Sequence, residues 1–129
     1  MRYEHAPDLK EQLNKIVEIL NLNHIDAERV GCIMSHGSKA KRVIARCHSL
    51  PKVIQKSMFA KPYYVVELIS EQFTKLDEEE KIKVLIHELL HIPKTFGGGF
   101  IHHNIVNRNL VEKLYKNLKN NLNQDAETL

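Results

Sequence analysis

The pentapeptide His87-Glu88-Leu89-Leu90-His91 constrains this chain of 129 residues more than any other feature. In an α-helix, residues i and i+4 lie one turn apart on the same face, so His87 and His91 can both direct an imidazole nitrogen at one metal ion. Glu88 would then lie beside that ion as a candidate base. The pattern H-E-x-x-H combines two zinc ligands with a water-activating carboxylate, provided that the segment is helical.

The residues on either side of this motif favour a helix. Asp77 is a candidate N-cap, and Glu80 follows it at the spacing of a capping box. Apolar side chains then recur at i, i+3, i+4 and i+7, as expected of a core-facing stripe: Ile82, Leu85, Ile86 and Leu89. Pro93 stops the helix just after His91. The sequence therefore predicts a helix that carries a metal site beside its buried stripe.

Length and composition predict a single domain spanning residues 1–129. A chain of this size buries about two thirds of its unfolded surface around one core. The polar residues 121–129 are expected to form a frayed tail. Among the cysteines, Cys32 and Cys47 are too few for a disulfide framework, which is consistent with a cytoplasmic protein.

Charge and hydropathy also limit the partners. The net charge of +3 is too small to indicate a nucleic-acid-binding surface, and the basic run at residues 38–42 leaves nucleic acid only as an unfavoured partner. The sequence contains no apolar run of the length that crosses a bilayer and no hydrophobic signal region at its N-terminus. We therefore expect no membrane partner. The sequence indicates neither a substrate-binding residue nor an oligomeric state.

The remaining segments predict an α+β fold. An amphipathic first helix begins at residues 7–8, with Asp8 and Glu11 as a second capping pair. The strongest strand prediction is Tyr63–Ile69, which is rich in β-branched and aromatic residues. Other segments are expected as follows: a hairpin or similar connection from β-prone runs at 29–35 and 41–48, a loop with a short helical turn at 50–58, and a last helix over about 104–120.

A catalytic zinc site usually has three protein ligands and an open position for water, so a third donor is needed. His102 and His103 are adjacent candidates after the glycines at 97–99. They cannot both point at one ion if they begin one helix, because they would be about 100° apart. We favour His103, because Asn104 follows it as a helix-start residue. His102 and, less favoured, Glu112 remain alternatives.

A second group of residue types could suit a structural zinc site: Cys32, His36, Cys47 and His48. A strand would place Cys47 and His48 on opposite faces, which argues against a shared ion. We favour the interpretation that the cysteines are buried and that the histidines are unrelated to them. Tyr115 on the last helix is a candidate oxyanion donor, although an aromatic residue at that spacing is more often part of the core.

The segment 87–93 and the later Gly97-Gly98-Gly99-Phe100-Ile101-His102-His103-Asn104 together carry a resemblance. The chain resembles the small zincin-type metallopeptidases of archaea and phages, which are similar to the minimal zincins called minigluzincins. This resemblance implies a backing helix and a small mixed β-sheet packed on an active-site helix with the HExxH motif, followed by a C-terminal helix that carries the third ligand. It also implies one Zn²⁺ ion and Glu88 as the general base.

The function that follows is hydrolysis of peptide bonds in a peptide or protein substrate by a metal-activated water. The alternatives are a metal-dependent hydrolase of a non-peptide bond and a non-catalytic metal-binding interaction module. In related sites the substrate lies along an exposed strand edge above the helix. We expect the strand at 63–69 to supply that edge by strand addition.

Overall fold

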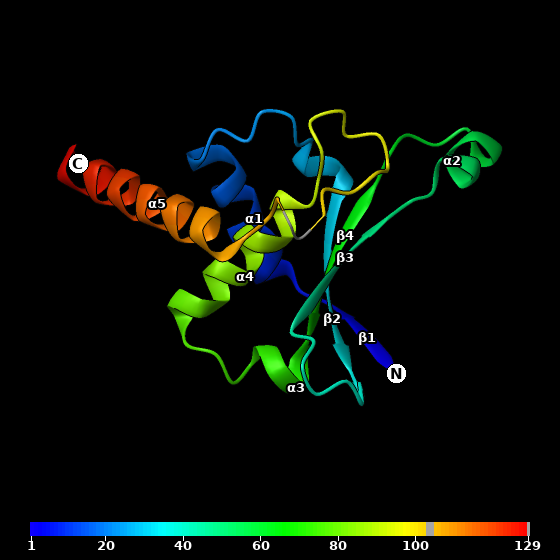
Figure 1. Cartoon of the computed structure of the whole chain (residues 1–129), viewed down its shortest axis with the longest axis horizontal. Coiled ribbons are helices and arrows are strands. Elements are labelled where there is room, and N and C mark those ends of the chain that lie inside the picture. The colour runs from blue at the N-terminus through cyan, green and yellow to red at the C-terminus, as the bar shows by residue number, and fades with distance from the viewer. Residues whose placement is uncertain (103–104, 129) are drawn as a thin grey trace.

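The computed structural model describes residues 1–102 and 105–128 (Figure 1). The strands are β1 (Arg2–His5), β2 (Val30–His36), β3 (Ala45–Ser49) and β4 (Tyr64–Ile69). The helices in the described residues are α1 (Pro7–Ile19), α2 (Lys52–Met58), α3 (Ser70–Phe73), α4 (Glu78–Leu90) and α5 (Arg108–Thr128), with a 3-10 turn at Ala27–Arg29. The predicted α+β class is confirmed, and a helix runs through the pentapeptide up to Leu90.

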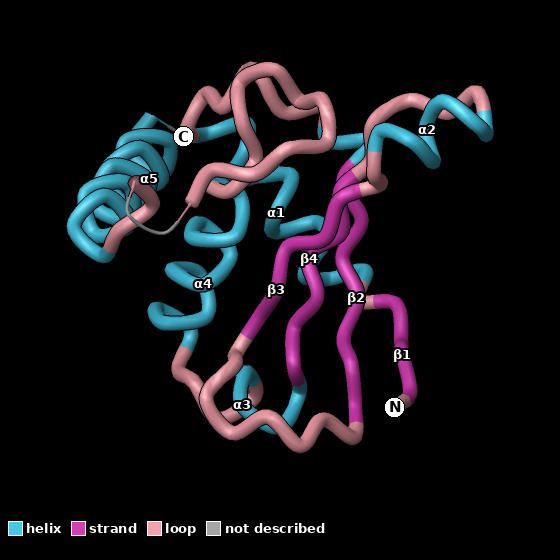
Figure 2. Tube along the Cα trace, turned by 45° about the vertical axis from the view of Figure 1, so that its right-hand side comes forward, coloured by secondary structure: helices cyan, strands magenta, loops and turns pink. Residues whose placement is uncertain are grey.

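The four strands form one mixed sheet in the order β1-β2-β4-β3 (Figure 2). The pair β2·β4 is parallel, whereas β1·β2 and β3·β4 are antiparallel. The predicted hairpin of the second and third strands is therefore wrong, because β4 lies between them. Burial explains this order: β4 is the most deeply buried strand and takes a central position, whereas the shorter and more polar β3 lies at the edge. The strand β1 was not predicted, because its four residues are all exposed and show no apolar alternation.

Helices α1 and α4 cover one face of the sheet, and α5 packs against both of them (Figure 2). Their contact with the sheet is apolar and fully buried, with Leu13 from α1, Val66 and Leu68 from β4, and Leu85 and Ile86 from α4. Each of these side chains stabilises the fold by about 1.5–3 kcal/mol through burial. The stripe predicted for the metal-site helix is thus the contact that fixes α4 on the sheet.

The helix ends agree with the predictions only in part. At α4 the Asp77 side chain accepts a hydrogen bond from the Glu80 N–H at 2.8 Å, as predicted. At α1 the predicted capping pair is wrong, because Pro7 occupies the first helical turn and no side chain caps the helix. At α5 the Asn107 side chain accepts from the Leu110 N–H at 3.0 Å, so the helix starts later than predicted. It also continues to Thr128, beyond residue 120.

Residues 52–58 form the complete helix α2, where only a helical turn was predicted. It connects β3 to β4 and projects beyond the end of the sheet (Figure 1). Within the described part of the chain, every helix is too short or too polar to span a bilayer.

Candidate metal centre

His87 and His91 converge at the C-terminal end of α4. Their Nε2 atoms are 3.2 Å apart, and their rings meet edge to face with an interplanar angle of 74°. Two imidazole nitrogens bound to one tetrahedral zinc ion, each at 2.0–2.1 Å, would be separated by about 3.3 Å. The observed separation therefore fits two ligands of one ion. His87, Glu88 and His91 are the only group of metal-binding side chains among the described residues.

Glu88 is buried beside the two histidines, with 5% of its surface exposed. Among the described residues its Oε2 atom has no hydrogen-bond partner. Burial raises the pKa of this carboxyl from 4.5 to about 7, because the charged form loses its hydration. A buried carboxylate without a partner is costly unless a cation approaches it, so this side chain also fits a metal site.

The orientation of His91 is fixed by the backbone of Ile101. Its Nδ1 atom is 2.5 Å from the Ile101 carbonyl oxygen, and the Ile101 N–H donates to the His91 carbonyl at 2.8 Å. Because a carbonyl can only accept, Nδ1 carries the proton and the lone pair of His91 lies on Nε2. This tautomer is the one that a metal ligand at Nε2 requires. The sequence did not reveal this contact, since any residue can supply a carbonyl.

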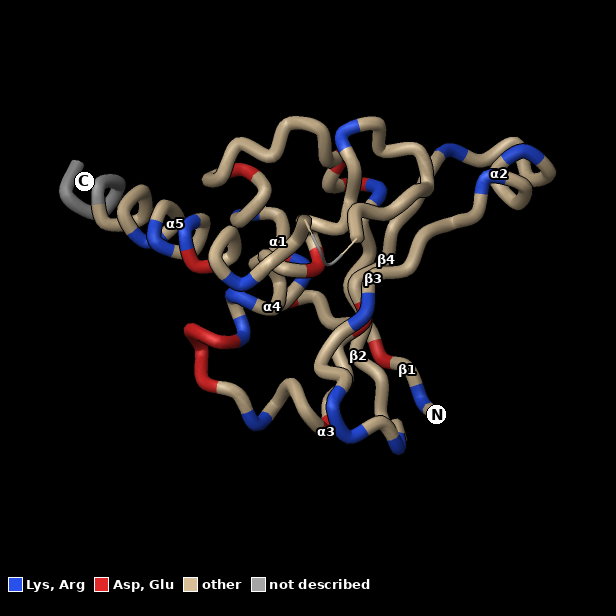
Figure 3. The backbone as a smooth tube through the Cα atoms, viewed as in Figure 1, with Lys and Arg blue, Asp and Glu red and all other residues tan. Residues whose placement is uncertain are grey.

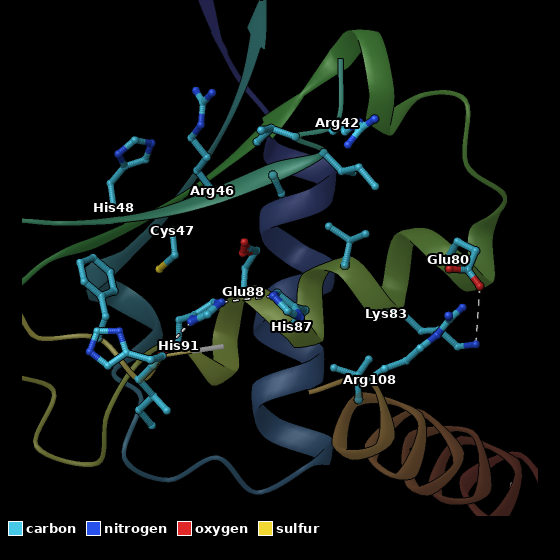
Figure 4. A pocket seen from close by; sticks show the side chains of 18 of the residues that line it. Arg42, Arg46, Cys47, His48, Glu80, Lys83, His87, Glu88, His91 and Arg108 are labelled. Atoms are coloured by element: carbon cyan, nitrogen blue, oxygen red, sulfur yellow. Dashed lines mark hydrogen bonds and ion pairs between the residues drawn. The ribbon is translucent and has the colours of Figure 1, made fainter. Parts of the chain in front are cut away.

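A cleft of about 890 Å³ lies over these side chains, between β3 and the helices α4 and α5. Figure 4 shows Arg42, Lys83 and Arg108 towards one end of the cleft and His48 towards the other. Cys47 and Glu88 lie between these ends, from opposite walls.

The edge of the sheet at the cleft belongs to β3, which contacts α4. Two backbone hydrogen bonds mark the ends of the pairing between β3 and β4. The Ile69 N–H donates to the Ile44 carbonyl, and the Leu50 N–H donates to the Tyr63 carbonyl. In an antiparallel pair the bonded residues alternate, so 44, 46, 48 and 50 face β4. Ala45, Cys47 and Ser49 consequently direct their N–H and C=O groups outward, along the free edge. The expectation that the strand at 63–69 supplies this edge is wrong, because both edges of β4 are paired.

The candidates for the third ligand have different positions. His103, the favoured residue, and Asn104 lie outside the described residues, so that prediction stays a prediction. His102 lines the cleft next to Ile101. Glu112 also lines it, but its carboxylate is 2.8 Å from the Lys83 ammonium, which lowers the pKa of Glu112. The condition that both histidines begin one helix is not met by His102, since α5 starts at Arg108.

The second group of cysteines and histidines does not assemble. Burial raises the pKa of the Cys32 thiol to about 11, and burial together with the charge of Glu88 raises that of Cys47 to about 12. The His36 ring contacts the Glu4 carboxylate at 2.8 Å, and the His48 ring contacts Glu67 at 2.7 Å. These contacts support the interpretation that the histidines are unrelated to the cysteines; Cys32 is buried as predicted, whereas Cys47 is only half-buried.

Tyr115 is buried between α4 and α5. Its ring packs under the ammonium of Lys83, which is 5.1 Å from the ring centroid. It belongs to the core, as the spacing favoured, and it is not among the residues that line the cleft. A role for Tyr115 as an oxyanion donor is therefore not supported.

Comparison with known proteins gives one match. A family model described as "Putative phage metallopeptidase" matches residues 1–128. This range includes the pentapeptide, β3 and the five α-helices of the described residues. No curated protein and no solved structure matches the chain.

Proposed function

The chain belongs to this family of phage metallopeptidases, which confirms the phage-type resemblance, and on that premise we propose that it is a zinc-dependent peptidase with a minimal zincin fold. One observation carries the proposal: two imidazole Nε2 atoms lie 3.2 Å apart beside a buried carboxylate whose Oε2 atom lacks a hydrogen-bond partner among the described residues. In the zincin arrangement α1 is the backing helix, α4 the active-site helix and α5 the C-terminal helix.

We assign His87 and His91 as two ligands of a single Zn²⁺ ion. His103 is the proposed third ligand and His102 the alternative. Both follow Ile101 in the sequence, and the Ile101 carbonyl contacts the His91 ring. A bound zinc ion would lower the pKa of its water towards about 7 and would polarise the substrate carbonyl. Neutral histidine ligands leave most of the positive charge of the ion to act on that water.

We assign Glu88 as the general base. It accepts a proton from the attacking water and returns a proton to the amide nitrogen as the C–N bond breaks, so that one carboxyl serves both steps. Its burial favours this exchange, because burial raises the pKa of the metal-free carboxyl to about 7, and a zinc-bound water would also have a pKa of about 7. Because Glu88 lies next to His87 in the same helical turn, the proton is transferred within the metal site.

The free edge of β3 is the proposed binding surface for the substrate backbone. Ala45, Cys47 and Ser49 present N–H and C=O groups at intervals of two residues, which is the pattern that an added strand requires. The edge borders the cleft above His87 and His91. A substrate paired there would extend over the ligands, with its scissile bond in the cleft.

The proposal is tested by hydrolysis of an unstructured protein with and without a chelator, using the variant Glu88→Gln. We expect the chelator to abolish cleavage, zinc to restore it, and Glu88→Gln to lower the rate at least a hundredfold while zinc remains bound. Glu80→Gln is the matched control, since Glu80 lines the same cleft two turns earlier in α4. Cleavage that survives chelation, or a Glu88→Gln variant as active as the parent, would reject the mechanism.

A further inference from the structure

Helix α2 exposes its apolar side chains instead of burying them. None of its seven residues is buried, and Val53 and Met58 are 73% and 63% exposed. Phe59, which ends the helix in the left-handed conformation with φ of 55°, is 97% exposed. The segment 52–61, called the α2 tip below, is thus a protrusion with an apolar surface (Figure 1).

The polar side of α2 is the side that holds it to the protein. Gln55 donates hydrogen bonds to the carbonyls of Leu50 at 2.6 Å and Gly97 at 3.3 Å. At 100° per residue, Val53 and Ser57 are each about 160° from Gln55, so Val53 faces away from the body. Gly98 has φ of 111°, and a Cβ there would lie 2.8 Å from the Gln55 side-chain nitrogen. The orientation of α2 is therefore built into the fold.

A helix this short needs contacts with another surface to be stable. Seven residues are too few to form a stable helix from their intrinsic preference alone, so the stability of α2 must come from contacts. Among the described residues the side-chain hydrogen bonds from α2 to the body come from Gln55, whereas Val53, Met58 and Phe59 stay exposed and available to a partner. Clustered apolar side chains on a protruding segment are typical of a binding surface.

The charge of the α2 tip selects the kind of partner. Lys52, Lys56 and Lys61 flank the apolar side chains, and the segment 50–63 contains no Asp or Glu (Figure 3). A second copy of the chain would bring the two sets of lysines together, so like charges disfavour self-association through the tip. An anionic surface would pair with the lysines and take up the apolar side chains at the same time.

We propose that the α2 tip binds the surface of a bilayer that contains anionic phospholipid, with Phe59 and Met58 inserted between the headgroups. The tip is convex, and a convex apolar surface with flanking lysines fits a deformable lipid surface without a preformed groove. The sequence-based expectation of no membrane partner considered segments that cross a bilayer and a signal region at the N-terminus, and it is revised here for surface binding. The proposal is independent of the peptidase chemistry.

The absence of Trp from the chain provides a direct reporter. In the full chain carrying Phe59→Trp, fluorescence should shift to shorter wavelength on addition of vesicles of phosphatidylglycerol and phosphatidylcholine. Vesicles of phosphatidylcholine alone should produce no shift. Leu122→Trp is the matched control, because Leu122 is 46% exposed on α5, and its emission should not change with either vesicle.

Vesicle co-sedimentation then measures how much the lysines and Phe59 each contribute to vesicle binding. Each lysine near an anionic surface contributes about a fivefold increase in affinity, so replacing Lys52, Lys56 and Lys61 together by Gln should weaken binding about a hundredfold. Phe59→Ser should weaken it at least about tenfold. Glu88→Gln should bind vesicles as the parent does, which separates this test from that of the peptidase. Equal binding to neutral vesicles, no binding to anionic ones, or self-association lost in Phe59→Ser would overturn the proposal.

Discussion

Replacing Glu88 by Gln should stabilise the metal-free protein while removing its proposed activity. The carboxyl is buried, its Oε2 atom has no hydrogen-bond partner among the described residues, and its pKa is raised from 4.5 to about 7 by desolvation. Folding in the absence of metal must therefore either protonate this group or bury its charge. Gln has nearly the same shape and no charge, so the variant avoids that cost.

The pH dependence has a definite sign. Below pH 4.5 the carboxyl is protonated in the folded and unfolded states, and its titration costs no stability. Between pH 4.5 and pH 7 the unfolded state ionises first, so the free energy of unfolding falls as the pH rises. Above pH 7 the penalty is constant at about 3 kcal/mol, from 1.36 kcal/mol for each pH unit between the two pKa values.

The assay is urea unfolding of the chelated parent and Glu88→Gln proteins at pH 5 and pH 8. The variant should gain about 2–3 kcal/mol over the parent at pH 8, equivalent to about 10 °C in Tm, and little at pH 5. Both proteins carry the same histidines, so their titration largely cancels in the difference. Glu11→Gln, at an exposed position of α1, is the control and should show no such pH dependence.

Zinc provides the second half of this experiment. A cation beside Glu88 compensates its charge, so saturating zinc should reduce the advantage of the variant at pH 8. The reasoning would be refuted if Glu88→Gln were no more stable than the parent at pH 8, or if its advantage were the same at both pH values. Either result would mean that the carboxylate has a compensating partner in the metal-free protein.

Three further changes have defined outcomes. In separate His102→Ala and His103→Ala variants, zinc stoichiometry measured by atomic emission should fall to zero for the third ligand and remain near one for the other residue. Gly98→Ala should lower the free energy of urea unfolding by about 1–3 kcal/mol, because φ is 111° and the added Cβ would meet Gln55 at 2.8 Å; Gly99→Ala, whose Cβ would meet no atom within 4 Å, is its control. Asp77→Ala should cost about 1 kcal/mol in the same measurement through loss of the N-cap bond to Glu80, whereas Asp77→Asn should cost much less.

Local patterns predicted the metal-site helix and could not predict the sheet. The cap at Asp77, the stripe through Leu89 and the two histidines lie within fifteen residues of sequence, where spacing determines the face of a helix. The order of the strands depends on pairing between residues far apart in the sequence, such as Val30 with Tyr64. Nothing in the spacing of 29–35 and 41–48 revealed that a later strand separates them.

The edge strand illustrates the consequence for function. The apolar character of β4 identified it correctly as a strand. The same character places it in the centre of the sheet, because the N–H and C=O groups of a buried strand need hydrogen-bond partners on both edges. The edge at the cleft is formed by β3, whose sequence Ala-Arg-Cys-His-Ser carries little apolar signal. The prediction for the start of α5 was also wrong, because Asn104 and Asn107 are equally good caps by residue type, and the side chain that accepts the cap bond is that of Asn107.

Cys47 provides a last test of which group performs the chemistry. Its thiol lines the cleft near Glu88, where a nucleophilic cysteine would also lie. Burial and the nearby carboxylate raise its pKa from 9.0 to about 12, so at neutral pH its thiolate should be at least a hundredfold scarcer than that of an ordinary thiol. We expect iodoacetamide to alkylate Cys47 at least a hundredfold more slowly in the native chelated protein than in urea, and Cys47→Ala to retain peptidase activity. Rapid alkylation of the native protein together with loss of activity in Cys47→Ala would instead identify a thiol nucleophile in this cleft.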